Sequence, residues 1–308
     1  MSQAEWLADD LGMIDLLFRG QERLIVGWVM PTSDGLVLAE CGPTSTLPNL
    51  LAGIEALGLR PDDLRHILLT HIHLDHAGAA GTLLERFPEA TLYVHEIGAP
   101  HMIDPSRLLQ SAARVYGGRM DALWGDFLPC PAERVVVLHD GDRLELGDLT
   151  LDVLYTPGHA SHHVAFYRPS DGALIAGDVA GVRVPPSRLV WPPTPPPDVD
   201  AELWHASLDR LRAVNPSRLL VTHAGAFDDV NEHLAALDER IDDFVRLVAQ
   251  WQAEGLERDA IAARLAQWSA ELTVAAGETP MTPGMIENVT PFGMSVDGVL
   301  RYLRRRDG

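Results

Sequence analysis

Short apolar runs of strand length dominate the first two thirds of the chain, and stretches of helical periodicity lie between them. The first three runs, at Met13–Phe18, Leu24–Met30 and Gly35–Ala39, predict a meander of strands. Further strands are predicted at His66–Thr70, Thr91–His95, Arg134–Leu138, Arg143–Leu146, Thr150–Tyr155, His163–Tyr167, Ala173–Ala176 and Arg218–Thr222. Helices are predicted at Thr46–Leu57, Ala77–Phe87 and Ala201–Val214. This pattern predicts an α/β fold.

The last quarter of the chain has an almost wholly helical pattern. Helices are predicted at Glu232–Glu254, Arg258–Ala270 and Val296–Arg305. We therefore expect residues 1–230 to form the α/β domain and residues 231–308 a C-terminal helical extension. Seven prolines between Pro185 and Pro197 exclude a helix or central strand there and predict a stiff, extended loop. Residues 105–131 have a less regular, partly helical pattern.

Charge and composition narrow the function classes. The chain has 24 basic residues, all of them Arg, against 44 acidic ones, which gives a net charge of −20. Such an acidic surface disfavours nucleic acid as a partner. The N-terminus lacks the features of a secretory signal, and no apolar run reaches the roughly 18 to 20 residues of a membrane span. We therefore expect a cytoplasmic protein that does not bind membranes. The 2 cysteines, Cys41 and Cys130, offer neither a disulfide framework nor a thiolate metal cluster.

One segment concentrates metal-binding side chains. His71, His73, Asp75 and His76 follow directly after an apolar strand-like run. Imidazole nitrogens and carboxylate oxygens suit Zn, Mn or Fe(II), and a loop that leaves a strand end can direct several of them to one point. A solvated, His-rich turn is the alternative interpretation of this segment alone.

Three further candidate ligands also follow predicted strands. His159 comes after the strand at Thr150–Tyr155, Asp178 after Ala173–Ala176, and His223 directly after Arg218–Thr222. Because ligands bind at the ends of strands in open α/β sheets, we expect these side chains to meet the first cluster. Core packing alone would not place ligand-type side chains at four separate strand ends.

The motifs HIHLDH, TPGH, AGD and TH, in this order, resemble those of the metallo-β-lactamase-fold hydrolase superfamily over roughly Met13 to Phe227. The resemblance implies an αββα sandwich with a centre of two divalent metal ions, Zn in the first instance, with Fe or Mn as alternatives. His71, His73 and His159 would hold the first ion. Asp75, His76 and His223 would hold the second, and Asp178 would bridge the two.

The same resemblance implies hydrolysis of a small ester, lactone or thioester by a hydroxide held between the two ions, as in the glyoxalase II-like and lactonase-like branches. Asp75 would be catalytic by passing a proton to the leaving group. Glyoxalase II enzymes hold glutathione carboxylates with basic side chains, whereas this chain has no Lys and shows only Arg183 shortly after Asp178. The Tyr that lactonases often carry is also absent between Val179 and Val190.

Two other functions stay open from the sequence. A persulfide dioxygenase-like oxidoreductase would use a single iron and fewer ligands, and a non-catalytic metal-binding scaffold would use the fold without turnover. The expected partner is a small-molecule substrate, and the helical extension is a candidate surface for a homodimer.

Several residues around the motifs are expected to support the site or to pack beside it. His163 is expected to support the ligands, and His162 is expected in an exposed turn rather than facing substrate. Five apolar side chains either pack in the core or line the mouth of the site: Tyr116, Met120, Trp124, Phe127 and Trp191.

Overall fold

The computed structural model describes residues 3–278 and 291–307, and two β-sheets form its centre. Sheet A has the strand order β1-β2-β3-β4-β5-β6-β7, and sheet B has the order β13-β12-β11-β10-β9-β8. The strands of sheet A are β1 Ala4–Ala8, β2 Leu11–Asp15, β3 Val26–Thr32, β4 Gly35–Ala39, β5 Leu64–Leu68, β6 Thr91–His95 and β7 Val135–Leu138. Those of sheet B are β8 Arg143–Leu146, β9 Leu149–Tyr155, β10 Val164–Arg168, β11 Ala173–Ile175, β12 Arg218–Val221 and β13 Gly225–Phe227.

Strand direction changes once within sheet A. Strands β1 to β4 pair antiparallel, which confirms the predicted meander, and β4 to β7 pair parallel. In sheet B, β11 and β12 are the parallel pair and the other neighbours are antiparallel. Parallel neighbours require crossover connections, and helices supply them between the parallel strands of both sheets.

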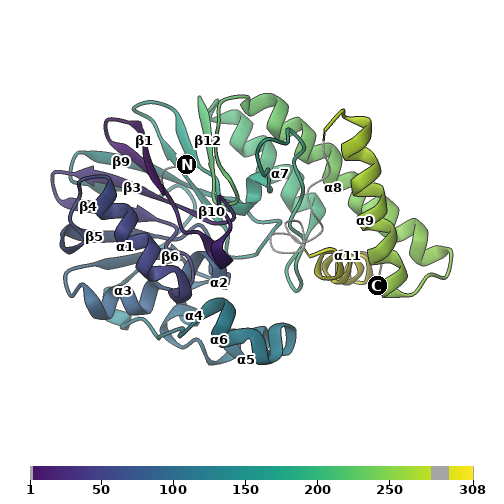
Figure 1. Ribbon diagram of the computed structural model, residues 1–308, viewed down its shortest axis with the longest axis horizontal. Helices are drawn as coiled ribbons and strands as arrows, with labels where there is room; N and C mark the ends of the chain where they lie inside the picture. The colour runs from purple at the N-terminus through teal and green to yellow at the C-terminus, as the bar shows by residue number, and fades with distance from the viewer. Residues whose placement is uncertain (1–2, 279–290, 308) are drawn as a thin grey trace.

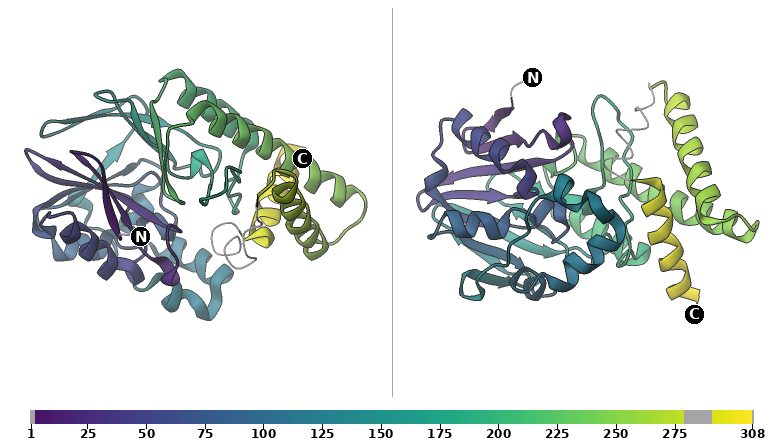
Figure 2. Two further views of the ribbon diagram at one scale, coloured as in Figure 1. Left: turned by 45° about the horizontal axis from the view of Figure 1, so that its top comes forward. Right: turned by 60° about the horizontal axis from the view of Figure 1, so that its bottom comes forward.

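Helices cover the outer faces of both sheets (Figures 1 and 2). In the first half of the chain they are α1 Leu47–Ala56, α2 Leu74–Ala77, α3 Ala80–Arg86, α4 Ala99–Ile103, α5 Ser106–Tyr116 and α6 Met120–Trp124. In the second half they are α7 Ala201–Ala213, α8 Val230–Ala253, α9 Arg258–Ala275 and α11 Phe292–Asp307. The predicted αββα sandwich with C-terminal helices is therefore confirmed.

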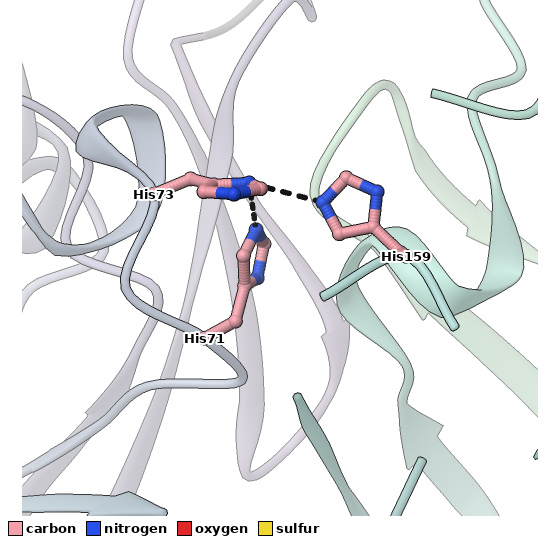
Figure 3. Close-up of side chains that lie close together, drawn as sticks. All are labelled: His71, His73 and His159. Atoms are coloured by element: carbon pink, nitrogen blue, oxygen red, sulfur yellow. Dashed lines mark hydrogen bonds between the residues drawn. The ribbon is translucent and has the colours of Figure 1, made fainter. Parts of the chain in front are cut away.

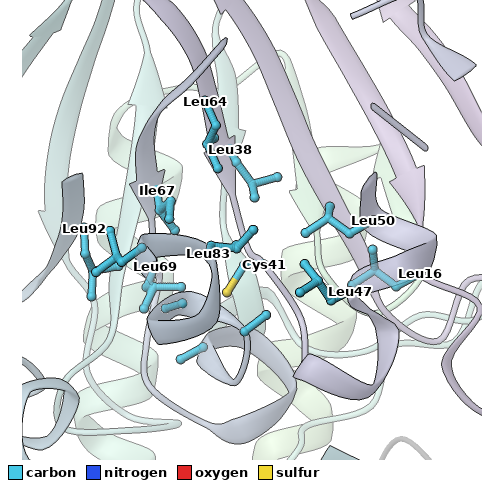
Figure 4. Close-up of a cluster of buried hydrophobic side chains, with 14 of the residues drawn as sticks. Leu16, Leu38, Cys41, Leu47, Leu50, Leu64, Ile67, Leu69, Leu83 and Leu92 are labelled. Carbon is cyan, nitrogen blue, oxygen red and sulfur yellow. The ribbon is translucent and has the colours of Figure 1, made fainter. Parts of the chain in front are cut away.

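Three apolar clusters hold these layers together. Trp28 of β3 and Phe166 of β10 are fully buried between the two sheets. A second cluster, shown in Figure 4, packs Leu38 and Ile67 of sheet A against helices α1 and α3. The third joins sheet B to α7 and to the C-terminal helices α8, α9 and α11. Each sheet thus buries both faces, as an αββα arrangement requires.

The C-terminal helices are integrated with sheet B through this third cluster, in which Phe244 of α8, Leu265 of α9 and Val299 of α11 are buried. The boundary between residues 230 and 231 stays a prediction, and part of the extension, residues 279–290 and 308, lies outside the described residues. None of the helices in the described part of the chain has the length and apolar character needed to cross a bilayer.

Most predicted elements appear within two residues of their expected bounds, and a few differ for local reasons. The predicted helix at Ala77–Phe87 is two helices, α2 and α3, because the Ala79 amide donates to the Gly42 carbonyl at 2.8 Å instead of continuing the helical ladder. Strands β1 and β13 and helix α4 were not predicted. The proline-rich loop is extended as expected, and a single bridge between Val182 and Trp191 ties it together.

A charged contact joins helix α7 to helix α8, and its contribution to stability can be tested. His205 of α7 contacts Asp238 and Asp242 of α8 through its two ring nitrogens, at 2.5 and 3.0 Å. Burial alone would lower the pKa of His205, but the hydrogen bond to Asp238 and the charge of Asp242 outweigh it and raise the pKa. Because the pKa is higher in the folded state, the stabilising contribution is complete below the unfolded value of about 6.5 and is lost as the pH rises through the folded pKa.

We predict that His205→Gln lowers the free energy of unfolding by about 0.5 to 1 kcal/mol near pH 5.5 and by much less near pH 9, since the imidazole is partly exposed. Urea unfolding of chelator-treated protein, followed by circular dichroism at both pH values, measures the difference. His139→Gln is the matched control: His139 lies 3.5 Å from Glu96, but both side chains are 56% exposed, so solvent screens that contact and the expected loss is small. An equal loss at both pH values would contradict the charged contact.

Candidate metal centre

The seven candidate ligands come from four strand ends and meet at one edge of the sandwich. His71 and His73 lie in the loop after β5, and Asp75 and His76 lie on the short helix α2 that follows. His159 follows β9. Asp178 lies in the 3-10 turn at Gly177–Ala180 after β11, and His223 follows β12. The structure brings all seven together, as the strand-end argument predicts.

Three imidazoles form the first cluster (Figure 3). The Nε2 atom of His71 lies 2.9 Å from Nδ1 of His73, and Nε2 of His159 lies 3.0 Å from the same atom. Three ring nitrogens from two sheets therefore converge within hydrogen-bond distance of one another. Nδ1 of His73 has either one proton or one lone pair in the ring plane, so it cannot form hydrogen bonds with both neighbouring nitrogens. A metal cation, in contrast, can accept one lone pair from each of the three rings.

The second cluster consists of Asp75, His76 and His223. Nε2 of His223 lies 3.4 Å from Oδ2 of Asp75. Asp178 lies between the clusters: its Oδ1 is 3.4 Å from Nε2 of His76 and 3.5 Å from Nε2 of His223, and its Oδ2 is 3.5 Å from Nε2 of His159. The two carboxylate oxygens of Asp178 thus face different clusters.

Backbone carbonyls fix the ring tautomers of two of these histidines. Nδ1 of His159 donates to the Pro193 carbonyl at 2.8 Å, and Nδ1 of His223 donates to the Leu24 carbonyl at 2.5 Å. Because a carbonyl oxygen only accepts, Nδ1 carries a proton in both rings, and Nε2 is the atom that each ring directs at the cluster. This is the arrangement that metal-binding histidines adopt.

The electrostatics differ between the two clusters. Burial lowers the pKa of His71 well below its usual value and lowers that of His73 to about 4, so both rings are neutral. Burial also acts against the charged forms of His76 and His223, but the Asp178 carboxylate outweighs it and raises the pKa of both. Without a bound cation, His76 and His223 therefore take up protons, and their positive charge balances the negative charge of Asp178.

Seven buried side-chain polar atoms lack a hydrogen-bond partner among the described residues, and two of them lie in the middle of the site. These two are Nε2 of His76 and Oδ1 of Asp178. Buried polar groups in folded proteins are nearly always paired, so unpaired atoms here mark a position for another group. A nitrogen lone pair and a carboxylate oxygen are both metal ligands, and the donor set therefore fits a metal site.

The sequence analysis missed Glu40, which follows β4. Its side chain is fully buried; Oε1 accepts from the Thr70 amide at 2.8 Å, and Oε2 accepts from the Thr222 hydroxyl at 3.1 Å and from Nδ1 of His76. The backbone of Glu40 has φ 65°, a left-handed conformation that is costly for a residue other than glycine. The buried Glu40 carboxylate therefore accepts from Nδ1 of the candidate ligand His76 and orients its ring, although its own backbone conformation is unfavourable.

Helix α7 also supports the site. The indole Nε1 of Trp204 donates to the Val179 carbonyl at 2.8 Å, and its ring lies edge-on to that of His159 with centroids 5.7 Å apart. A Cβ at Gly158 would lie 2.4 Å from the Trp204 Cα, so only glycine fits there. One tryptophan therefore positions the turns that carry both Asp178 and His159.

Two predictions about neighbouring histidines have different outcomes. His163 supports the site as expected: its ring bonds the Thr156 hydroxyl at 2.9 Å and accepts from the Val179 amide. The expectation of an exposed His162 is wrong. Its ring is buried, with its centroid 6.0 Å from that of His71 and 5.6 Å from that of His73. The neighbouring rings of His71 and His73 help to bury the His162 side chain.

The apolar set that was expected to pack or to line the mouth divides into two groups. Trp191 packs against Phe244 and Trp268 of the C-terminal helices, away from the other members. The other four belong to the cluster between sheet A and its helices: Trp124 and Phe127 are buried in it, and Tyr116 and Met120 pack against it. Core packing therefore describes the whole set.

Comparison with known proteins gives a consistent picture. The sequence profile described as "Metallo-beta-lactamase superfamily" matches residues 24–223. A metallo-beta-lactamase fold-containing protein from Sulfurisphaera tokodaii is 29% identical over 178 residues, which cover 56% of this chain and 66% of that protein. A hydroxyacylglutathione hydrolase from Thermosynechococcus vestitus is 33% identical over 129 residues, covering 42% of this chain and 38% of the hydrolase.

A hydroxyacylglutathione hydrolase from Methylococcus capsulatus matches over more of its length, with 28% identity over 275 residues that cover 86% of this chain and 89% of the hydrolase. For the other two relatives the chain spans two thirds of their length or less.

Solved structures show the same architecture. An archaeal metallo-beta-lactamase superfamily protein from Sulfolobus tokodaii superposes with a TM-score of 0.58 at 25% identity, covering 72% of this chain and 81% of that one. A metallo-beta-lactamase family protein from Thermus thermophilus gives a TM-score of 0.63 at 22% identity, covering 92% of this chain and 89% of that one. The second likeness concerns the fold alone.

The contacts of Glu40 predict its effect on metal binding. In Glu40→Gln the amide oxygen can still accept from the Thr70 amide, but the amide NH₂ cannot accept from His76 or Thr222. We expect metal affinity to fall roughly tenfold to a hundredfold in a protein that remains folded. Competition with a chromophoric chelator measures the affinity.

The control for this substitution is Glu145→Gln, because the Glu145 side chain is 62% exposed. Equal metal affinity in the two variants would show that Glu40 does not support the site.

Proposed function

Because the chain belongs to the metallo-beta-lactamase superfamily, we propose that it is a metal-dependent hydrolase of a small ester, lactone or thioester. The observation that carries the proposal is the position of Asp178, whose two carboxylate oxygens face separate clusters of ring nitrogens. In this proposal His71, His73 and His159 hold one divalent ion, Zn in the first instance. Asp75, His76 and His223 hold a second, and Asp178 is shared.

Two such ions, when bound, supply an activated water at neutral pH and polarise the bond to be cleaved. The protein's own contribution begins with Asp75. Its side chain is 26% exposed, against 5% for Asp178, so it is the carboxylate that substrate can reach. Burial alone would raise the pKa of Asp75, but His76 and His223 hold it below its usual range. Asp75 is therefore ionised, and in the proposed reaction it takes a proton from the attacking water and passes it to the leaving group.

The two relatives named hydroxyacylglutathione hydrolase make a thioester a natural first substrate class. A glutathione thioester is less well supported. The Arg183 guanidinium, the basic group nearest in sequence after Asp178, is buried, pairs with Asp229 at 2.8 Å and stacks over the Phe227 ring at 4.5 Å. A guanidinium held in this way does not offer its charge to a substrate carboxylate. We therefore propose an acyl substrate without the carboxylates of glutathione.

The proposal predicts which bond class the protein cleaves. Metal-loaded protein should hydrolyse at least one member of a panel of uncharged esters, lactones and thioesters. His71→Ala should lose at least a hundredfold in kcat/KM because one cluster loses a ligand. Product formation by mass spectrometry and metal content by plasma emission are the measurements.

The same panel separates the competing functions. One iron per chain with oxygen consumption on a persulfide would favour a dioxygenase. Two bound ions without turnover of any bond class would favour a metal-binding scaffold.

The role of Asp75 has its own test. Asp75→Asn keeps the size of the side chain but cannot take up a proton, so kcat should fall roughly a hundredfold or more. Metal content must be measured in the same samples because Asp75 is also a proposed ligand. Full activity with normal metal content would contradict the proton-transfer role. The Asp152→Asn variant controls for the loss of one charge, because the Asp152 side chain is 35% exposed and pairs with Arg143 on β8.

A further inference from the structure

The loop between β2 and β3 of sheet A reaches the metal centre at the end of β12 in sheet B. It spans residues 16–25. The Leu24 carbonyl accepts from Nδ1 of His223 at 2.5 Å, and the Val26 amide donates to the Thr222 carbonyl at 2.9 Å. This loop therefore supplies the contact that orients the His223 ring, whose Nε2 faces the second cluster.

The backbone of the loop is strained. The angle φ is 48° at Leu17, 56° at Arg19 and 60° at Arg23. The left-handed region is unfavourable for residues that have a Cβ. Strain continues on the other side of the contact, since Ala224, which follows His223, has φ 123°. Such conformations persist only where surrounding contacts enforce them.

Asp15, the last residue of β2, supplies enforcing contacts. Its side chain is buried; Oδ1 accepts from the Leu17 amide at 3.0 Å, and Oδ2 accepts from the Arg23 amide at 2.8 Å. A carboxylate is an acceptor at both oxygens, so it can bind both amides at once. At the base of the loop the Leu16 amide donates to the Ile25 carbonyl at 3.0 Å. Asp15 therefore holds the two ends of the strained segment together.

The contacts of Asp15 lead directly to the metal ligand. Arg23, whose amide bonds Asp15, immediately precedes Leu24, whose carbonyl bonds His223. Rotation of the Arg23 backbone out of the left-handed region would move the Leu24 carbonyl relative to the sheet. Nδ1 of His223 would then lose the acceptor that fixes its proton and the direction of its ring, and partners of this kind tune the affinity of metal-binding histidines.

We propose that Asp15 is a positioning residue for the metal ligand His223: it holds residues 17–23 in the strained conformation that directs the Leu24 carbonyl at Nδ1 of His223. This role rests on the proposed function, because it requires the ion of the second cluster. It does not require Asp15 to contact the ion or the substrate.

The test compares Asp15→Asn with Asp148→Asn in the full-length protein. An Asn at position 15 offers one acceptor oxygen and an NH₂ group, so one of the two loop amides would face a donor. Asp148 is exposed, and its Oδ1 accepts from the Ser33 amide at 2.8 Å, in the turn at the opposite end of β3. It is therefore a matched carboxylate-to-amide contact away from the metal centre.

Titration with Co²⁺ gives the affinity, and its visible absorption reports the geometry of the ligands. In Asp15→Asn the affinity of the second cluster should fall roughly tenfold to a hundredfold, with a changed absorption band. The first cluster should keep its affinity, and Asp148→Asn should match the wild type.

Hydrogen exchange in the wild type tests the same coupling without any substitution, should Asp15→Asn not fold. If the loop determines the ligand, then by reciprocity metal binding must stabilise the loop. Co²⁺ binding should slow exchange of the amides in residues 16–24 several-fold, and exchange around Ser33 should not change.

The outcomes separate this inference from the function on which it rests. Equal second-cluster affinity and absorption in Asp15→Asn and Asp148→Asn would overturn it. A lower melting temperature with an unchanged Co²⁺ spectrum would assign Asp15 a structural role and also overturn it, as would loop exchange that does not respond to Co²⁺. Two bound ions without turnover of any substrate would refute the hydrolase function alone, because none of these measurements uses turnover. A wild type that binds no Co²⁺ would refute both.

Discussion

The buried carboxylate of Glu40 is the constraint on which the site depends. It extends from the end of β4 and is bonded to the Thr70 amide, the His76 ring and the Thr222 hydroxyl group. Those partners come from the loop after β5, from α2 and from the end of β12, so one side chain joins both sheets. A carboxylate removed from water costs on the order of several kcal/mol unless each oxygen is paired. The contacts of Glu40 therefore hold the strand ends in the arrangement that positions the candidate ligands.

The three apolar clusters exclude water from around the candidate ligands, and this burial sets their protonation. Burial keeps the rings of His71 and His73 neutral, while Asp178 attracts protons to His76 and His223. The orphaned Nε2 of His76 and Oδ1 of Asp178 show that the protein's own groups, in the part of the chain described, do not complete this site. Functional sites often contain locally unfavourable arrangements, and the stability of the rest of the fold offsets their cost. Here the unfavourable arrangement is a group of buried carboxylates and rings that takes up protons in the absence of metal, and a bound metal ion would replace those protons.

The sequence predicted the elements and the seven candidate ligands because both leave local signals. Strand periodicity and the spacing of His71, His73, Asp75 and His76 are visible in short windows. Glu40 could not be found in this way, since its partners are 30, 36 and 182 positions away and a single acidic residue after a strand has no characteristic spacing. The burial of His162 depends on rings that only the folded chain brings to it. Strand β13 has three residues and β1 is largely exposed, so neither shows a periodic pattern.

The absence of Lys has a structural counterpart in how the chain uses its Arg residues. Arg134 donates to the carbonyl groups at the end of α3 and after it, on Leu84, Phe87 and Ala90. Arg240 is held between the rings of Trp191 and Trp268 and pairs with Asp243 at 2.7 Å, which ties the proline-rich loop to α8 and α9. Arg183 is paired in a similar way. These guanidinium groups hold loops in place because a planar, weakly hydrated cation can be buried at a lower cost than an ammonium. Buried positive charge in this protein therefore serves the scaffold.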